Sequence, residues 1–105
     1  MFGFGPKLDI NKIRQELTAG TAVLVDVREP DEWDAGHASG AINLSVNRIN
    51  RGEVPNPDTS KKVYLYCVSG GRAGNAAHLL KQKGYDTENI GGLSGWRAAG
   101  GSVES

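Results

Sequence analysis

The chain of 105 residues contains a single cysteine, Cys67, and only two histidines. One cysteine cannot form an internal disulfide, and the sequence has no Cys-x-x-Cys pair or histidine cluster with the spacing of a zinc site. We therefore expect neither a disulfide-stabilised fold nor a bound metal. The thiol must be either a small buried side chain or a reactive group.

The sequence also lacks a net charge, because twelve Lys and Arg residues balance twelve Asp and Glu residues. Proteins that bind nucleic acid or anionic membranes usually carry an excess of positive charge, so neither partner is predicted. Residues 1–9, MFGFGPKLD, contain no basic segment followed by a long apolar stretch, so we expect no signal peptide or membrane span. The cytoplasm is the default location, although an exported protein without its signal would look the same.

The length and the hydrophobic content of 38% are those of one domain with one core. No repeat or low-complexity tract divides the chain. We expect a single, monomeric domain over residues 1–105. Within it, residues 1–7 are expected to form a flexible N-terminal segment and residues 102–105 a C-terminal tail.

Strand and helix patterns alternate along the sequence. Two continuous apolar runs, residues 22–27 (AVLVDV) and 63–67 (VYLYC), predict strands that are buried on both faces. Shorter strands are predicted at residues 41–45 and 87–92. Helices are predicted in the intervening and flanking segments, at residues 10–20, 29–36, 46–52, 73–84 and 94–100. This order predicts an α/β domain with a mainly parallel sheet, in which ligands bind beyond the carboxyl ends of the strands.

A glycine-rich loop follows the second long strand. The segment 64–80, YLYCVSGGRAGNAAHLL, passes through Cys67 into a turn and then into a helical pattern. The backbone N–H groups of such a turn and of a helix N-terminus form a concave site for an anion. Gly70, Gly71 and Gly74 allow the positive φ angles of a tight turn and leave its amides unobstructed. We therefore predict that the loop holds an anion beside the thiol.

The same loop predicts a reactive thiol. An ordinary cysteine has a pKa of about 8.5, whereas helix N-termini and nearby cations lower the pKa to about 3.5–7.5. Arg72 supplies a cation within the loop. A cysteine that only fills the core would not need glycines directly after it. We therefore favour a nucleophilic role for Cys67 over a packing role.

Three further residues are candidates for supporting this site. His37 could act as a base for Cys67, but a loop histidine more often binds backbone carbonyls. Asp26 and Arg28 follow the first long apolar run and should share an edge of the sheet with Cys67. We expect them to form a structural salt bridge that anchors a loop. His78 lies about 16 Å along the helix from Cys67 at 1.5 Å per residue, too far to touch the sulfur.

Three segments of the sequence resemble, in order, the signatures of the single-domain rhodaneses, which are thiosulfate-type sulfurtransferases. Residues 26–44 (DVREPDEWDAGHASGAINL) are similar to the first signature, and residues 64–86 (YLYCVSGGRAGNAAHLLKQKGYD) to the active-site strand, loop and helix. Residues 90–101 (IGGLSGWRAAGG) are similar to the C-terminal signature. The resemblance covers residues 8–101. It implies a three-layer α/β domain with a central, mainly parallel five-stranded sheet and helices on both faces.

The resemblance also implies a site. Cys67 would carry sulfur as a persulfide, taken from thiosulfate or another persulfide donor and passed to cyanide, a thiol or a thiol protein, without a metal or organic cofactor. The residues after it would form the substrate cradle, and these are Val68, Ser69, Gly70, Gly71 and Arg72. Many relatives have a basic residue directly after the cysteine. Val68 stands there in this chain, which leaves Arg72 as the only cation of the loop.

Two other functions are compatible with a cysteine in an anion-binding loop. Cysteine phosphatases and arsenate reductases are one class, but the phosphatase loop is Cys-x5-Arg, often followed by Ser or Thr. This chain has Cys-x4-Arg followed by Ala73, a tighter loop without that hydroxyl. The other alternative is a non-catalytic rhodanese-like interaction or sulfur-carrier module. Such modules commonly lose the cysteine, whereas this chain keeps it.

Overall fold

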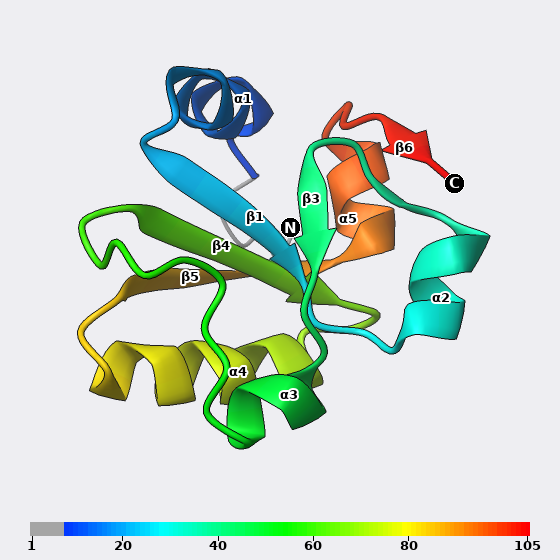
Figure 1. Cartoon of the computed structure of the whole chain (residues 1–105). Coiled ribbons are helices and arrows are strands. Elements are labelled where there is room, and N and C mark those ends of the chain that lie inside the picture. Colours follow the sequence, from blue (N-terminus) through cyan, green and yellow to red (C-terminus); the bar gives the residue numbers. More distant parts are fainter. Residues whose placement is uncertain (1–7) are drawn as a thin grey trace, which may run out of the picture.

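The computed structural model describes residues 8–105 of the chain. The segment expected to be flexible, residues 1–7, lies outside the described residues. Five helices and six strands follow one another in this part of the chain (Figure 1). None of these helices is both long enough and apolar enough to cross a membrane. The elements are α1 (Ile10–Ala19), β1 (Ala22–Asp26), α2 (Pro30–Ala35), β2 (His37–Ala38), β3 (Ala41–Asn43), α3 (Val46–Asn50), β4 (Lys62–Cys67), α4 (Gly71–Gln82), β5 (Asp86–Gly92), α5 (Leu93–Ala98) and β6 (Val103–Glu104).

The central sheet contains four parallel strands in the order β3-β1-β4-β5. Strand β4, which ends at Cys67, lies between β1 and β5. Its register pairs Leu65 with Val25 on one side and with Asn89 on the other. The prediction of an α/β domain with a mainly parallel sheet is therefore confirmed.

The expected number of strands in the central sheet was wrong, because the described residues supply four strands to it and not five. The sequence pattern predicts only four strands, and the fifth strand is implied by the resemblance alone. The two other strands, β2 and β6, have two residues each and pair with one another in an antiparallel ladder. The expected C-terminal tail, residues 102–105, thus includes a strand that pairs with His37 and Ala38.

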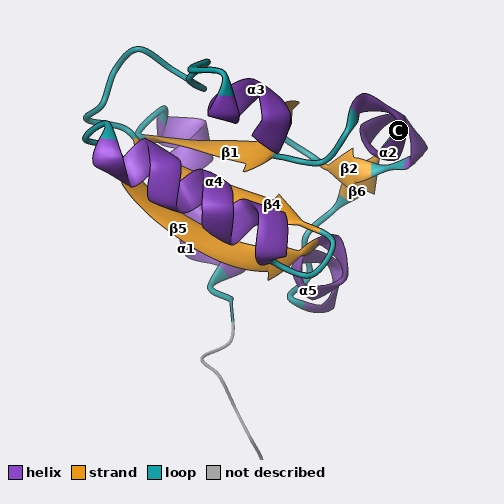
Figure 2. Cartoon of the chain, turned by 90° about the horizontal axis from the view of Figure 1, so that it is seen from below, coloured by secondary structure: helices purple, strands orange, loops and turns teal. Residues whose placement is uncertain are grey.

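Helices cover both faces of the sheet (Figures 1 and 2). Because side chains alternate along a strand, β4 contributes to two separate core clusters. Val63, Leu65 and Cys67 pack with residues of α3 and α4, while Tyr64 and Tyr66 pack with residues of α1 and α5. The thiol of Cys67 therefore lies on the α4 side of the sheet, next to the N-terminus of α4.

The starts of helices α2 and α4 follow from their first residues. Helix α2 begins with Pro30 and has a capping box, in which the side chain of Glu32 accepts a hydrogen bond from the backbone N–H of Glu29 at 3.0 Å. Helix α4 is preceded by Gly70, which has a φ of +97° and forms the N-cap. Only glycine adopts this left-handed conformation without strain.

Candidate active site

The sulfur of Cys67 lies at the start of α4 and accepts hydrogen bonds from the backbone. The N–H of Gly70 lies 3.1 Å from Sγ, and the N–H of Ala73 lies 3.4 Å from it. These donors belong to the turn and to the first turn of the helix, where N–H groups have no partner within the helix. The glycine-rich loop thus wraps around the sulfur and presents backbone donors to it.

This arrangement acts on the protonation of the thiol in two opposite ways. Burial of Cys67 raises its pKa, because a thiolate is poorly solvated in the core. The backbone N–H groups of Ala73, Gly70, Ser69 and Arg72 lower the pKa more, because they stabilise the thiolate. The pKa of Cys67 therefore lies below the ordinary value of a cysteine. The direction is that expected for a nucleophile.

The loop shields the sulfur and exposes other side chains. Only 1% of Cys67 is accessible to solvent, whereas the next residue, Val68, is 56% exposed. Ser69 and Gly71 are also exposed. A ligand that reaches the sulfur must therefore meet the outer surface of the loop. At this surface Val68 presents an apolar side chain.

Arg72, the expected cation of the loop, forms a bidentate ion pair. Its two terminal nitrogens lie 2.7 and 3.0 Å from the two carboxylate oxygens of Glu32 on α2. Arg72 lowers the pKa of Glu32 to about 2, chiefly through these hydrogen bonds. The pKa of Arg72 is raised, mainly by Glu32 and to a smaller extent by the charge of Cys67. Sequence reasoning missed Glu32, because nothing in the sequence links two residues that are 40 positions apart.

Strand β5 supports the loop from the side, through residues that sequence reasoning also missed. The amide of Asn89 donates a hydrogen bond to the carbonyl of Gly70 at 2.9 Å, and its oxygen accepts one from the N–H of Gly91 at 2.9 Å. Gly92 lies so close to the loop that a Cβ atom there would overlap the carbonyl oxygen of Val68. The only available signal was the pair of glycines at the end of the predicted strand.

Asp26 and Arg28 form a buried ion pair at the carboxyl end of β1. Their closest atoms, Oδ2 of Asp26 and a terminal nitrogen of Arg28, are 2.7 Å apart. The hydroxyl of Tyr66 donates to Oδ2 of Asp26 at 2.7 Å and accepts from the N–H of Ala38 at 2.9 Å. Arg28 also donates to the carbonyl of Gly36 at 2.6 Å. The network ties β1 and β4 to residues 36–38. These residues directly follow α2, the helix that carries Glu32.

His37 lies on β2 and contacts residues of α2 and β6. Its Nδ1 atom lies 2.9 Å from the carbonyl oxygen of Trp33, and its ring stacks on Trp33 with a centroid distance of 3.5 Å. Its Nε2 atom lies 3.7 Å from the carboxylate of Glu104. Cys67 is not among these contacts. The geometry thus favours the carbonyl-binding interpretation of His37 over a role as a base.

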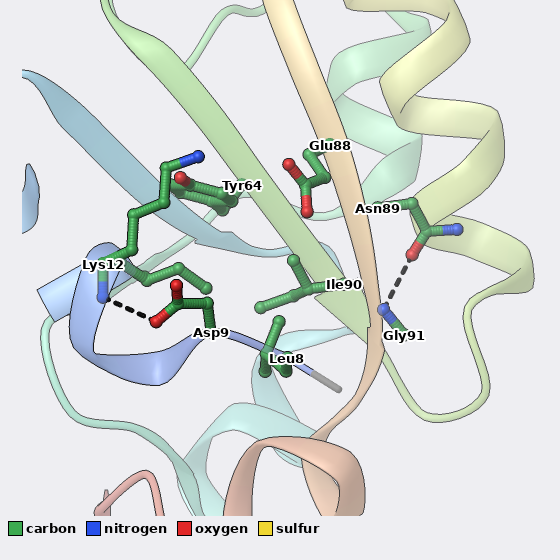
Figure 3. A pocket seen from close by; sticks show the side chains of 9 residues that line it. Leu8, Asp9, Lys12, Tyr64, Glu88, Asn89, Ile90 and Gly91 are labelled. Carbon is green, nitrogen blue, oxygen red and sulfur yellow. Dashed lines mark hydrogen bonds between the residues drawn. The ribbon is translucent and has the colours of Figure 1, made fainter. Parts of the chain in front are cut away.

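A cavity of about 420 Å³ lies on the α1 side of the sheet and does not include the thiol (Figure 3). Its lining comes from α1 with Leu8 and Asp9, from Tyr64 of β4 and from residues 88–91 of β5. The side chain of Asn89 points away from Tyr64 in this view.

Among residues 8–105, no group of three or more His, Cys, Asp or Glu side chains is arranged to bind a metal ion.

The fold and the site define a class: a three-layer α/β domain with a cysteine at the carboxyl end of a central strand, in a glycine-rich loop whose backbone N–H groups face the sulfur. The profile of the Rhodanese-like domain family matches residues 9–99. The chain therefore belongs to the rhodanese-like domain family.

Individual relatives extend this comparison. An uncharacterized protein of Synechocystis is 40% identical over 94 residues, which are 85% of this chain and 51% of that protein, so the chain spans about half of its length. The thiosulfate sulfurtransferase PspE of Escherichia coli is 37% identical over 71 residues, 66% of this chain and 68% of PspE. A solved structure described as a rhodanese with anions from E. coli has a TM-score of 0.61 and 34% identity, and covers 70% of this chain and 89% of its own.

The buried ion pair generates a prediction about stability. Replacing Asp26 with alanine leaves the buried Arg28 without its counter-ion, which should lower the free energy of unfolding by about 3–5 kcal/mol. Denaturant titration followed by circular dichroism measures this change. As a control, Glu53→Gln removes a carboxylate from the exposed pair with Arg48 and should change stability little. Equal effects of the two substitutions would contradict the role given to Asp26.

The contact between Gly92 and the loop generates a second prediction. Gly92→Ala should force Val68 and the loop to shift, lower stability by about 1–3 kcal/mol through overpacking, and raise the pKa of Cys67 as the N–H donors move. The control is Gly95→Ala in α5, where nothing lies within 4 Å of the new Cβ. That change should stabilise the protein by about 0.5–1 kcal/mol. Unfolding curves and the pH dependence of thiol alkylation test both variants, and an unaltered Gly92→Ala protein would refute the close contact.

Proposed function

We propose that the chain is a sulfurtransferase that moves sulfane sulfur through a persulfide on Cys67. The observation that carries this proposal is the set of backbone N–H groups, from Gly70 and Ala73, directed at the sulfur. The same donors that stabilise a thiolate can stabilise a terminal persulfide anion, because both place a negative charge on sulfur. The thiosulfate sulfurtransferase relative supports the assignment.

In the first step, the Cys67 thiolate attacks the outer sulfur of the donor. A new S–S bond forms to Cys67 while the S–S bond of the donor breaks, and the donor's remaining part leaves with the electron pair. With thiosulfate the leaving group is sulfite, and with a persulfide donor it is a thiolate. The exchange follows the rules of thiol–disulfide chemistry and needs no external oxidant.

In the second step, a nucleophilic acceptor attacks the outer sulfur of the Cys67 persulfide. The S–S bond breaks, and the thiolate of Cys67 leaves and is again held by the loop amides. A thiol or thiol-protein acceptor becomes a persulfide, and cyanide becomes thiocyanate. The two half-reactions make the mechanism ping-pong. The unpaired thiol suits a reducing compartment, so we propose that the reaction takes place in the cytoplasm. We further propose that the chain acts as a monomer.

The loop length supports sulfur transfer over phosphate-ester hydrolysis. Four residues separate Cys67 from Arg72, and Ala73 follows, so the position after the arginine has no hydroxyl to assist a thiolate leaving group. Within the described part of the chain, the contacts of Cys67 also include no acid that would protonate an alkoxide. The retained cysteine, with its lowered pKa, supports catalysis over a purely binding role.

The proposal predicts that Cys67→Ser folds like the wild type but transfers no sulfur, because a serine hydroxyl cannot store sulfane sulfur. Mass spectrometry of the wild type after exposure to thiosulfate or a small persulfide should show the gain of one sulfur atom on Cys67, reversed by cyanide. The serine variant should show no gain. Aryl-phosphate hydrolysis is measured in parallel, and efficient hydrolysis by the wild type would overturn the assignment.

The lowered pKa predicts a second behaviour of the wild type. Because the thiolate reacts with iodoacetamide and the thiol does not, the alkylation rate should reach half its maximum at a pH below about 8.5, the pKa of an ordinary cysteine. As the pH falls through the pKa of folded Cys67, the reaction should slow and the stabilisation of the folded state by the thiolate should be lost. A midpoint at or above the ordinary value would refute the role of the loop amides.

A further inference from the structure

The ion pair between Glu32 and Arg72 determines how much positive charge the loop offers to a ligand. Among residues 68–72, Arg72 is the only cation. Both of its terminal nitrogens are engaged by the carboxylate of Glu32, at 2.7 and 3.0 Å. Attraction of an anion to the arginine is therefore offset by repulsion from the carboxylate. The backbone N–H groups of the loop then supply most of the net attraction for an anion.

Glu32 is held firmly in this position. Its Oε1 atom accepts hydrogen bonds from the N–H of Glu29 and from Arg72, so the carboxylate is fixed both by the start of its own helix and by the loop. With a pKa of about 2, Glu32 is ionised throughout the neutral range. The negative charge beside Arg72 is a permanent part of the site.

We propose that Glu32 is a specificity-determining residue, which offsets the charge of Arg72 and thereby favours donors with one negative charge or none over the dianion thiosulfate. The inference rests on the proposed function and names its substrate class: small persulfides. In the favoured reaction the thiolate of Cys67 attacks the outer sulfur of R–S–S–H, the S–S bond breaks and RS⁻ leaves. The exposed, apolar Val68 is consistent with this preference, because it adds no charge to the loop.

The test removes the charge of Glu32 and keeps its shape. In Glu32→Gln, the amide oxygen can still accept from the N–H of Glu29, so the start of α2 is preserved. The two donors compared are thiosulfate, with two charges, and methanethiosulfonate, with one. Because an electrostatic energy scales with the charge of the ligand, kcat/KM should rise by about tenfold for thiosulfate and by about threefold for methanethiosulfonate.

Two further variants make the result specific. Glu53→Gln weakens another hydrogen-bonded Arg–Glu ion pair, with Arg48, outside the loop, and should leave both kcat/KM values unchanged. Glu32→Gln combined with Arg72→Gln has the net charge of the wild type and should restore the wild-type ratio between the two donors. If Glu32→Gln lowers kcat/KM for thiosulfate or changes both donors equally, the inference is wrong.

A measurement without turnover separates this inference from the proposed function. Bound sulfate or methanesulfonate should protect Cys67 from alkylation by iodoacetamide. Glu32→Gln should strengthen protection by sulfate more than protection by methanesulfonate, and it should lower the pH midpoint of alkylation, because the carboxylate that offsets the charge of Arg72 is removed. Failure of the wild type to take up sulfur overturns the proposed function and with it the preference among sulfur donors, while the protection measurements still test the charge offset by Glu32. An unchanged or raised midpoint, or equal changes in protection, overturns the role of Glu32.

Discussion

The hydrogen bonds from the loop amides to the sulfur of Cys67 are the interaction on which the site depends. They require that a strand end at the cysteine, that the chain turn at once, and that a helix begin within four residues. Gly70 makes this turn possible through its left-handed conformation. Strand β5 then fixes the turn, because Asn89 holds the carbonyl of Gly70 and Gly92 leaves room for the carbonyl of Val68. The chemistry of the Cys67 sulfur thus depends on the packing of β4 against β5.

Charge in this site is distributed over backbone dipoles more than over side chains. The loop has one cation, and a carboxylate from another helix neutralises it. A second ion pair, between Asp26 and Arg28, is buried at the end of β1 and hydrogen-bonded within the fold, so it contributes to the framework and not to the ligand surface. Arg28 and Arg72 both have raised pKa values because of their carboxylate partners. The field at the sulfur is therefore set mainly by the direction of a few N–H bonds.

The sequence predicted the features that arise from local patterns. Continuous apolar runs located β1 and β4 to within one residue, since a strand buried on both faces needs apolar side chains on both. The run of glycines after Cys67 located the loop. Contacts between distant segments could not be read in the same way. The bidentate pair of Glu32 with Arg72 and the support from Asn89 depend on how helices and strands assemble, and the two-residue pairing of β2 with β6 is too short to have a periodic pattern.

Strand β5 lies at the end of the four-stranded sheet, so one side of its backbone has no partner strand among the described residues. An open edge of this kind is a template for pairing with another chain, and proteins often protect it with charged side chains. Asp86 and Glu88 stand on β5, and the ammonium group of Lys62 lies 3.7 and 3.3 Å from their carboxylates. A second copy that docked at this edge would bring like charges together and would have to desolvate them. The strand that supports the loop after Cys67 thus also carries charges that oppose edge-to-edge aggregation.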